Sequence, residues 1–214
     1  MEALPKTQTK QDFDKVWDEN KLIQDAQLGK IDAFNQLILH YQNQAYNLAF
    51  HILHDAAAAD DATQEAFISA YRGLAKFRGG SFRAWLLRIT SNACYDELRR
   101  RKRHPAISWD DFGELEEEAN PHLVDEGARP EESVQQNELR VMLERVIAKL
   151  PEDQRMVLVL VDRLGLSYEE AAHTLHTRLG TVKSRLARAR SHMQAYLQEE
   201  RELLPPRYRL EDSI

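Results

Sequence analysis

The apolar positions from residue 31 to residue 54 recur at intervals of three and four, which is the spacing of one face of a helix. This stripe consists of Phe34, Leu37, Ile38, Tyr41, Ala45, Leu48 and Ile52. The pattern predicts a long amphipathic helix whose apolar face packs into a core.

Two further helices are predicted before residue 104. The first begins near Asp60 and Asp61, because acids suit a helix N-terminus, and it ends near the paired glycines at 79–80. Ser81 can cap the second, which runs from Phe82 into a basic run. Residues 21–103 are therefore predicted to form three packed helices.

Residues 104–133 lose the helical period and contain Pro105, Pro121 and Pro130. Acids are dense here, and Arg129 is the one opposing base up to residue 138. A segment of this kind buries too little apolar area to offset its chain entropy, so it is predicted to be an acidic flexible linker.

Helical spacing returns after the linker, from Leu139, and breaks at Pro151, which suits the first turn of the next helix. That apolar helix is predicted to end at Gly165. Ser167 and Glu170 then have the spacing of a capping box, which predicts a short helix over 168–175. A tight turn at 176–178 leads into a longer basic helix over 179–197, so the pattern is that of a helix-turn-helix.

The predicted fold is all-α, with two small helical domains joined by the acidic linker. We expect an N-terminal extension over residues 1–20 and a first domain over 21–103. The linker at 104–133 then leads to a helix-turn-helix domain over 134–200 and a C-terminal tail over 201–214.

Composition limits the classes of protein that fit. The chain has 214 residues, 43% of them hydrophobic, yet no apolar run approaches the ~20 residues of a membrane span. The first 15 residues lack the apolar stretch of a secretion signal, so we expect a cytoplasmic protein. The single cysteine, Cys94, excludes an internal disulfide and is expected to be a small core residue.

The net charge of −6 conceals a strong segregation of charge along the chain. Residues 88–103 carry six bases against two acids, and residues 176–192 carry five bases and no acid. Because potentials act over about 8–10 Å in physiological salt, these two basic segments can attract nucleic acid despite the acidic total.

The second helix of the predicted helix-turn-helix directs its bases outward while Val182, Leu186 and Ala189 face inward. Such a helix fits the major groove of DNA. An ordinary helical hairpin with a solvated basic face is the simpler alternative. The residues expected to face base edges and phosphates are Arg178, Thr181, Lys183, Ser184 and Arg185, and those nearer the backbone are Arg188 and Arg190.

Aromatic residues, arginines and paired glycines alternate from residue 77 to residue 85, which suits the holding of unpaired bases. We assign Phe82 and Trp85 to packing and retain Phe77, Arg78 and Arg83 as candidates for DNA contact. The basic run that includes Arg99 and Arg100 also fits an ordinary helix C-terminus.

The carboxylates of Asp60, Asp61 and Glu65 lie about one turn apart with Gln64, a spacing that can chelate a divalent metal. The sequence lacks a second such cluster and a nucleophile with a base, so an enzyme is disfavoured and no metal or cofactor is expected. A polar docking face explains these residues better.

Three segments resemble the sigma-70 family of RNA polymerase sigma factors, specifically its short extracytoplasmic-function (ECF) group. Residues 59–67 resemble the family's polymerase-docking helix, and residues 85–92 are similar to its minus-ten-reading helix. Residues 180–190 resemble the start of its minus-thirty-five recognition helix. The resemblance covers roughly residues 21–103 and 134–200.

The resemblance implies that the chain binds core RNA polymerase and promoter DNA, both duplex and melted, with an anti-sigma factor as a further partner. It adds Phe67 to the polymerase-binding set and Arg88 and Asn92 to the DNA-binding set. The family often has Asp where this chain has Ala58, and its turn usually has Gly where His176 stands, so we expect a reshaped turn.

A repressor of a different class fits the same helix-turn-helix. Its N-terminal helices would sense a ligand, and it would bind a palindromic operator without polymerase.

Overall fold

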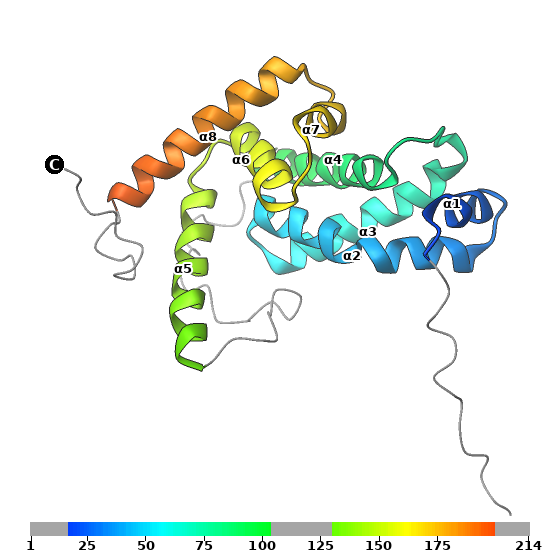
Figure 1. Cartoon of the computed structure of the whole chain (residues 1–214), viewed down its shortest axis with the longest axis horizontal. Coiled ribbons are helices and arrows are strands. Elements are labelled where there is room, and N and C mark those ends of the chain that lie inside the picture. The colour runs from blue at the N-terminus through cyan, green and yellow to red at the C-terminus, as the bar shows by residue number, and fades with distance from the viewer. Residues whose placement is uncertain (1–16, 104–129, 200–214) are drawn as a thin grey trace, which may run out of the picture. The chain divides into compact units, whose positions relative to one another are not determined.

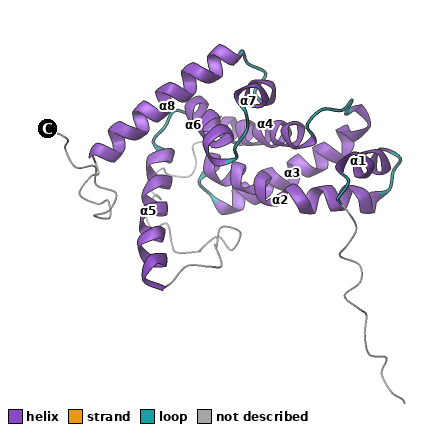
Figure 2. Ribbon diagram, viewed as in Figure 1, coloured by secondary structure: helices purple, strands orange, loops and turns teal. Residues whose placement is uncertain are grey.

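The computed structural model of the chain describes residues 17–103 and 130–199, and in these ranges every regular element is helical (Figures 1 and 2). The chain divides into two compact units, and the division falls after His40. The all-α class predicted from the sequence is confirmed for the described residues. The predicted acidic linker lies almost wholly outside them.

The first unit contains helix α1 (Glu19–Gln27), which the sequence pattern missed. The side chain of Asp18 caps it by accepting from the Lys21 amide at 3.0 Å. Gly29 follows with a φ of 88°, a left-handed conformation that glycine adopts without strain, and the chain then enters α2.

Helix α2 (Ile31–Leu53) matches the predicted amphipathic helix to within one residue. Its predicted inward positions are buried except Ile38, which is half-buried, and Leu37, Ala45 and Leu48 are completely buried. Helix α3 (Ala56–Gly73), followed by the 3₁₀ turn η1 (Leu74–Lys76), begins earlier than predicted.

The prediction that α3 starts at Asp60 and Asp61 was wrong by about one turn. Asp55 is the capping residue, because its side chain accepts from the Ala58 amide at 3.0 Å. Several acids precede this apolar stripe, and the sequence alone did not single out the one that caps.

Helix α4 (Phe82–Arg103) begins as predicted, with the Ser81 hydroxyl accepting from the Ala84 amide at 3.1 Å. It packs along α3. Cys94 is fully buried in α4, and this burial raises the pKa of its thiol to about 12. The prediction of a core cysteine is confirmed.

Helix α5 (Pro130–Ala148) starts before the position where apolar spacing resumes in the sequence. Pro151 is the residue immediately before α6 (Glu152–Leu158), and the helix continues into the π-helical turn η3 (Val159–Arg163). Burial of Met156, Val159 and Leu160 confirms the predicted apolar helix, whereas the π turn was not predicted.

Helices α7 (Tyr168–Thr174) and α8 (Leu179–Glu199) form the predicted helix-turn-helix and pack on each other. The capping box is present, with the Ser167 amide donating to the Glu170 carboxylate at 2.9 Å and the Glu170 amide to the Ser167 hydroxyl at 3.1 Å. Gly165 has a φ of 69°, as expected of a helix C-cap.

The turn before α8 contains His176, at the position where the family usually has Gly. His176 adopts a φ of 48°, so its backbone takes the left-handed conformation that a glycine would take there. The histidine therefore adopts a backbone conformation at this position that glycine reaches without strain.

Candidate nucleic-acid interface

Helix α8 has one buried face and one exposed basic face. Val182, Leu186 and Ala189 are buried and pack α8 onto α6 and α7. Around the helix, the opposite face carries the exposed residues Lys183, Ser184, Ala187, Arg188 and Ser191. A helix held in this way presents its polar face as one rigid surface.

Lys183 and Arg188 form no ion pair within the described residues, so their cationic groups face solvent. The Ser184 hydroxyl donates to the carbonyl of Thr181 at 3.0 Å, which keeps that side chain against its own helix. Free cations beside a small hydroxyl form a surface suited to phosphates and base edges.

Two other bases of α8 are paired. Arg185 is half-buried and its Nε lies 3.0 Å from Asp153 of α6. Arg190 donates two hydrogen bonds to Asp162 of η3, at 2.7 and 3.0 Å. These two acids were not singled out from the sequence, because neither is near its partner along the chain.

The N-terminus of α8 lies at the turn. The carbonyl of Arg178 accepts from the amides of Thr181 and Val182, at 2.9 and 3.2 Å, and the Arg178 side chain is exposed. His176 lies close enough to Arg88 of α4 for the cation to contribute to lowering the histidine pKa, after the larger effect of desolvation.

The segment before α4 is built around an aromatic cluster. Phe82 is fully buried, and Phe77 lies with its ring centroid 5.8 Å from Phe82 and 5.1 Å from Trp85. The packing role predicted for Phe82 and Trp85 is confirmed. Phe77 is only 9% exposed, so little of its ring is open to a base.

The two arginines of this segment differ in their surroundings. Arg78 is exposed in the loop, beside the left-handed Gly79 and Gly80. Arg83 is half-buried and donates to the Gln44 side chain at 2.5 Å and to the backbone carbonyl of Leu164. Its guanidinium is therefore bound within the chain in this structure.

The remaining candidates lie along α4. Asn92 is exposed and Arg88 is half-buried. Arg99 pairs with Asp96 at 2.8 Å, and Arg100 pairs with Glu97 at 2.6 Å. The hydrogen bond from Arg100 is the largest cause of the lowered pKa of Glu97.

The acidic residues of α3 form a second surface. Asp60, Asp61, Gln64 and Glu65 are exposed, and Phe67 is half-buried beside them. The side chains of Asp61 and Glu65 line a groove between α3 and α4, which is completed by Asp96, Glu97, Arg100 and the buried alanines Ala58, Ala62 and Ala93.

The acids of α4 were missed as part of this surface. In the sequence Asp96 and Glu97 appear only as exceptions within a basic run, and no local signal links them to α3. The packing of α3 on α4 brings them to the same groove.

Among the residues that the structure describes, no group of three or more His, Cys, Asp or Glu side chains is placed to hold a metal ion. In the same part of the chain no helix is both long enough and apolar enough to cross a bilayer.

Family models match both the part of the chain that contains the groove and the part that contains the helix-turn-helix. The family model for sigma-70 region 2 matches residues 37–104, which contain the groove and α4. The model for sigma-70 region 4 matches residues 140–193, which contain the helix-turn-helix.

Curated relatives match over most of their length. The RNA polymerase sigma-H factor of Pseudomonas aeruginosa is 38% identical over 181 residues, which cover 84% of this chain and 94% of that protein. The ECF RNA polymerase sigma-E factor of Escherichia coli K12 is 39% identical over 170 residues, covering 79% and 88% respectively.

Solved structures agree with the fold. The sigma factor RpoE of Bartonella quintana, in complex with the anti-sigma factor NepR, matches with a TM-score of 0.59 and 27% identity over 77% of this chain and 96% of that one. CnrH, in complex with the cytosolic domain of CnrY, also has a TM-score of 0.59, with 26% identity over 85% and 98%.

The two matched regions are those of a factor that binds polymerase and DNA together. The chain belongs to the sigma-70 family of RNA polymerase sigma factors, in its ECF group. It is a transcription initiation factor that directs core RNA polymerase to specific promoters, and a stand-alone repressor is not favoured.

Proposed function

We propose that the helix-turn-helix of this sigma factor binds the minus-thirty-five element as duplex DNA, with α8 in the major groove. The observation that supports this most is the single exposed face of α8, where Lys183, Ser184 and Arg188 are all open to solvent. Arg178, Thr181, Arg185 and Arg190 surround this face. Arg178 and Thr181 at the leading end are near base edges and phosphates, as recognition helices place their N-terminal residues.

In the same proposal α4 and the loop before it bind the melted minus-ten strand. Asn92 and Arg88 face the strand along α4, and Arg78 contributes from the loop. Arg83 joins them once it leaves its partners Gln44 and Leu164. Phe77 contributes only the small part of its ring that is exposed, and it mainly supports the loop from below.

Arg99 and Arg100 bind phosphates at the end of α4. Both are more than half exposed, and both form ion pairs with acids three residues earlier. Exposed pairs of this kind are worth about 0–1 kcal/mol, so a phosphate can replace the carboxylate at little cost.

The acidic surface of α3 docks on core polymerase. Asp60, Asp61, Gln64 and Glu65 supply an anionic and polar edge, and Phe67 supplies apolar area beside it. The groove formed with Asp96 and Glu97 extends this surface onto α4, so a cationic side chain of the polymerase would enter between the two helices.

In this proposal promoter opening uses binding energy alone. Unpairing and extruding a base costs a few kcal/mol, which a pocket for that base can offset without ATP. All of the bond chemistry then belongs to polymerase, so the chain is not itself an enzyme. Such a factor acts in the cytoplasm, where the chromosome and polymerase are.

Two further parts of the proposal concern regulation and the linker. Since a similar sigma factor was solved with an anti-sigma factor bound, we infer that an anti-sigma factor holds this chain inactive. The acidic segment 104–133 occupies the basic path of polymerase that RNA later follows, because its charge resembles that of nucleic acid.

In vitro transcription from genomic fragments, with core polymerase and the purified chain, tests the proposal. We expect new transcripts with defined starts that require both components. Transcripts that are the same with and without the chain would contradict it. Tight operator binding by the chain alone would favour the repressor instead.

A further inference from the structure

The exposed face of α8 is bordered on each side by an arginine that a carboxylate holds. Arg185 and Arg190 are five residues apart, which places them about 140° apart around the helix. Ser184, Arg188 and Ser191 lie between them on the exposed side, and the buried residues lie on the other. The two paired arginines are therefore the two edges of the candidate DNA-binding face.

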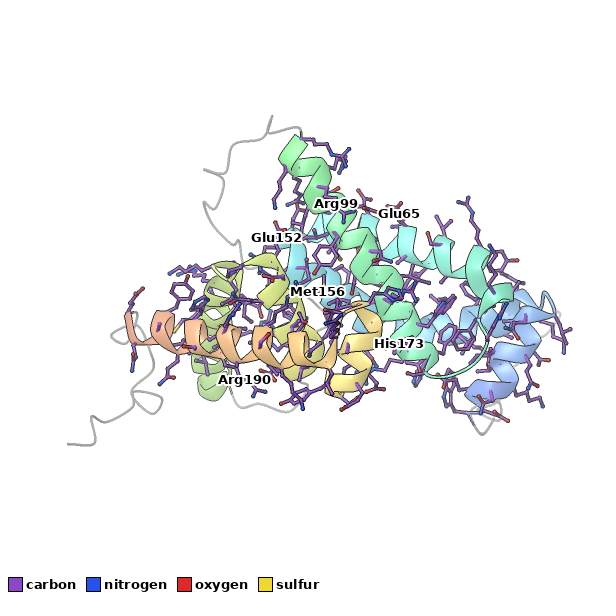
Figure 3. All side chains as sticks on the ribbon, turned by 90° about the horizontal axis from the view of Figure 1, so that it is seen from above. Glu65, Arg99, Glu152, Met156, His173 and Arg190 are labelled. Carbon is purple, nitrogen blue, oxygen red and sulfur yellow. The ribbon has the colours of Figure 1, made fainter. Side chains whose placement is uncertain are left out.

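On one edge, Asp162 holds Arg190 through both of its carboxylate oxygens. Arg190 Nη2 lies 2.7 Å from Oδ1 and Nε lies 3.0 Å from Oδ2. These bonds raise the pKa of Arg190 further above its ordinary value, mainly through the hydrogen bond to Asp162, so the cation is permanent. Figure 3 shows Arg190 projecting from α8.

The bidentate pair leaves part of the guanidinium available. Of its five N–H groups, two bond to Asp162, and the Tyr168 side chain is a further hydrogen-bond partner, so only the remaining donors are left for another oxygen. The side chain is 53% exposed, so a phosphate can reach those donors. Asp162 thus fixes which edge of Arg190 is presented.

The π-helical turn explains why Asp162 can do this. The Leu164 amide donates to the Val159 carbonyl at 2.9 Å, five residues back, so η3 is wider than an α-helix. Residues within such a turn face directions that a regular helix would not give them. Asp162 lies in this turn and reaches α8, whereas Asp153 reaches α8 from the regular helix α6.

On the other edge, Asp153 holds Arg185 by a single contact, 3.0 Å between Oδ2 and Nε. Only about a third of the Arg185 side chain is exposed, so this side chain can adopt few other orientations. A contact through Nε leaves both terminal nitrogens, which are the pair that binds a guanine or a phosphate.

We propose that Asp153 and Asp162 are positioning residues for DNA recognition, each orienting one border arginine of α8. The proposal rests on the proposed function, because it assumes that this face of α8 meets the minus-thirty-five element. It adds two acids, from outside the helix-turn-helix, to the residues that determine promoter selectivity.

For the removal of either acid the proposal predicts the opposite of what charge repulsion alone predicts. Removing an acid beside DNA should strengthen binding to every sequence, since one repulsive charge is lost. If the acid instead orients an arginine, its loss releases a mobile cation, and cognate binding weakens relative to binding of other sequences. The ratio of the two affinities separates these effects.

The experiment uses the full chain with core polymerase and a promoter fragment selected in the transcription experiment. A matched fragment has the minus-thirty-five element scrambled and everything else retained. Affinities for both fragments are measured for the parent and for Asp162→Asn and Asp153→Asn. Glu199→Gln is the control, because Glu199 is an exposed acid at the end of α8 that pairs with no described residue.

Each aspartate variant is expected to lower the cognate-to-scrambled ratio by about two- to fivefold, as fits the loss of one exposed ion pair. Glu199→Gln should leave the ratio unchanged. Asp162→Glu should retain most of the ratio, because a longer carboxylate can still accept from Arg190. Circular dichroism of each variant verifies that the helices remain folded.

A double-mutant cycle tests whether each acid acts through its arginine. In an Arg190→Ala background, Asp162→Asn should cause no further loss of the ratio, and Asp153→Asn should likewise have no effect with Arg185→Ala. Additive losses, or equal gains of affinity for both fragments, would overturn the inference. If the parent itself gave no promoter-dependent binding, the proposed function would fail instead.

Discussion

The capping box at the start of α7 gives a quantitative prediction, because it fixes the short helix on which α8 packs. α7 has seven residues. At its N-terminus the amides of Ser167 and Glu170 would otherwise lack acceptors, and each donates to the side chain of the other residue. Replacing Ser167 by alanine removes the acceptor of the Glu170 amide. Such a loss costs about 1 kcal/mol of folding free energy.

The same number sets the size of two observable effects. In a unit of 150–250 residues, such as the one that contains α7, 1 kcal/mol lowers the melting temperature by about 2–4 °C. It also corresponds to roughly a fivefold change in an opening equilibrium. We therefore expect Ser167→Ala to melt earlier by a few degrees and the Glu170 amide to exchange with solvent about five times faster.

Thermal circular dichroism and hydrogen exchange of the full chain measure these effects. Ser69→Ala is the matched control, because Ser69 is exposed within α3 and alanine has the higher helix propensity there. The control should melt at the parent temperature or slightly above. An unchanged melting temperature together with an unchanged Glu170 exchange rate would refute the role of the cap.

Three other predictions follow from the described side chains. Cys94 should not react with a thiol reagent at pH 8 until the chain is unfolded, because its burial raises the thiol pKa to about 12; fast labelling of the native chain would contradict this. Arg190→Ala should weaken binding to the cognate promoter and reduce the log-log salt slope by ~1, because this arginine is expected to contact a phosphate, whereas Arg185→Ala should relax sequence preference; an equal loss on every sequence for Arg185→Ala would oppose that assignment. Asp61→Ala with Glu65→Ala should weaken binding to core polymerase by about tenfold or more, as removal of two interfacial charges implies; unchanged core affinity would remove α3 from the docking surface.

Local signals explain the parts of the fold that the sequence predicted well. The bounds of α2 follow from an apolar stripe of constant period, and α4 and α7 start at serines whose hydroxyls bond amides three residues later. All of these interactions lie within one turn of the chain. They can therefore be recognised before any tertiary contact is known.

The errors arise where several residues compete or where a partner is distant. The start of α3 was misplaced because Asp55, Asp60 and Asp61 are all acceptable caps, and only the structure shows that Asp55 bonds the Ala58 amide. Helix α1 is short and its apolar pattern is weak. We recognise no sequence pattern that would have predicted the π turn at Val159–Arg163.

The candidate site also has a part that the sequence predicted and a part that it did not. The basic face of α8 was predicted because helical spacing alone separates Lys183 and Arg188 from the buried Leu186. The pairing of Arg190 with Asp162, 28 residues away, was not predicted, because it depends on how α8 packs on η3. The burial of Phe77 was not predicted either, because it also depends on tertiary packing.

In the proposed promoter complex α8 holds the duplex while α4 holds the melted strand on polymerase. A footprint of the promoter complex tests this most directly, with strand-specific cleavage around minus thirty-five and permanganate reactivity of thymines around minus ten. We expect protection upstream and reactive thymines downstream only when the chain and core polymerase are both present. Protection of a palindrome by the chain alone, with no reactive thymines under any condition, would contradict it.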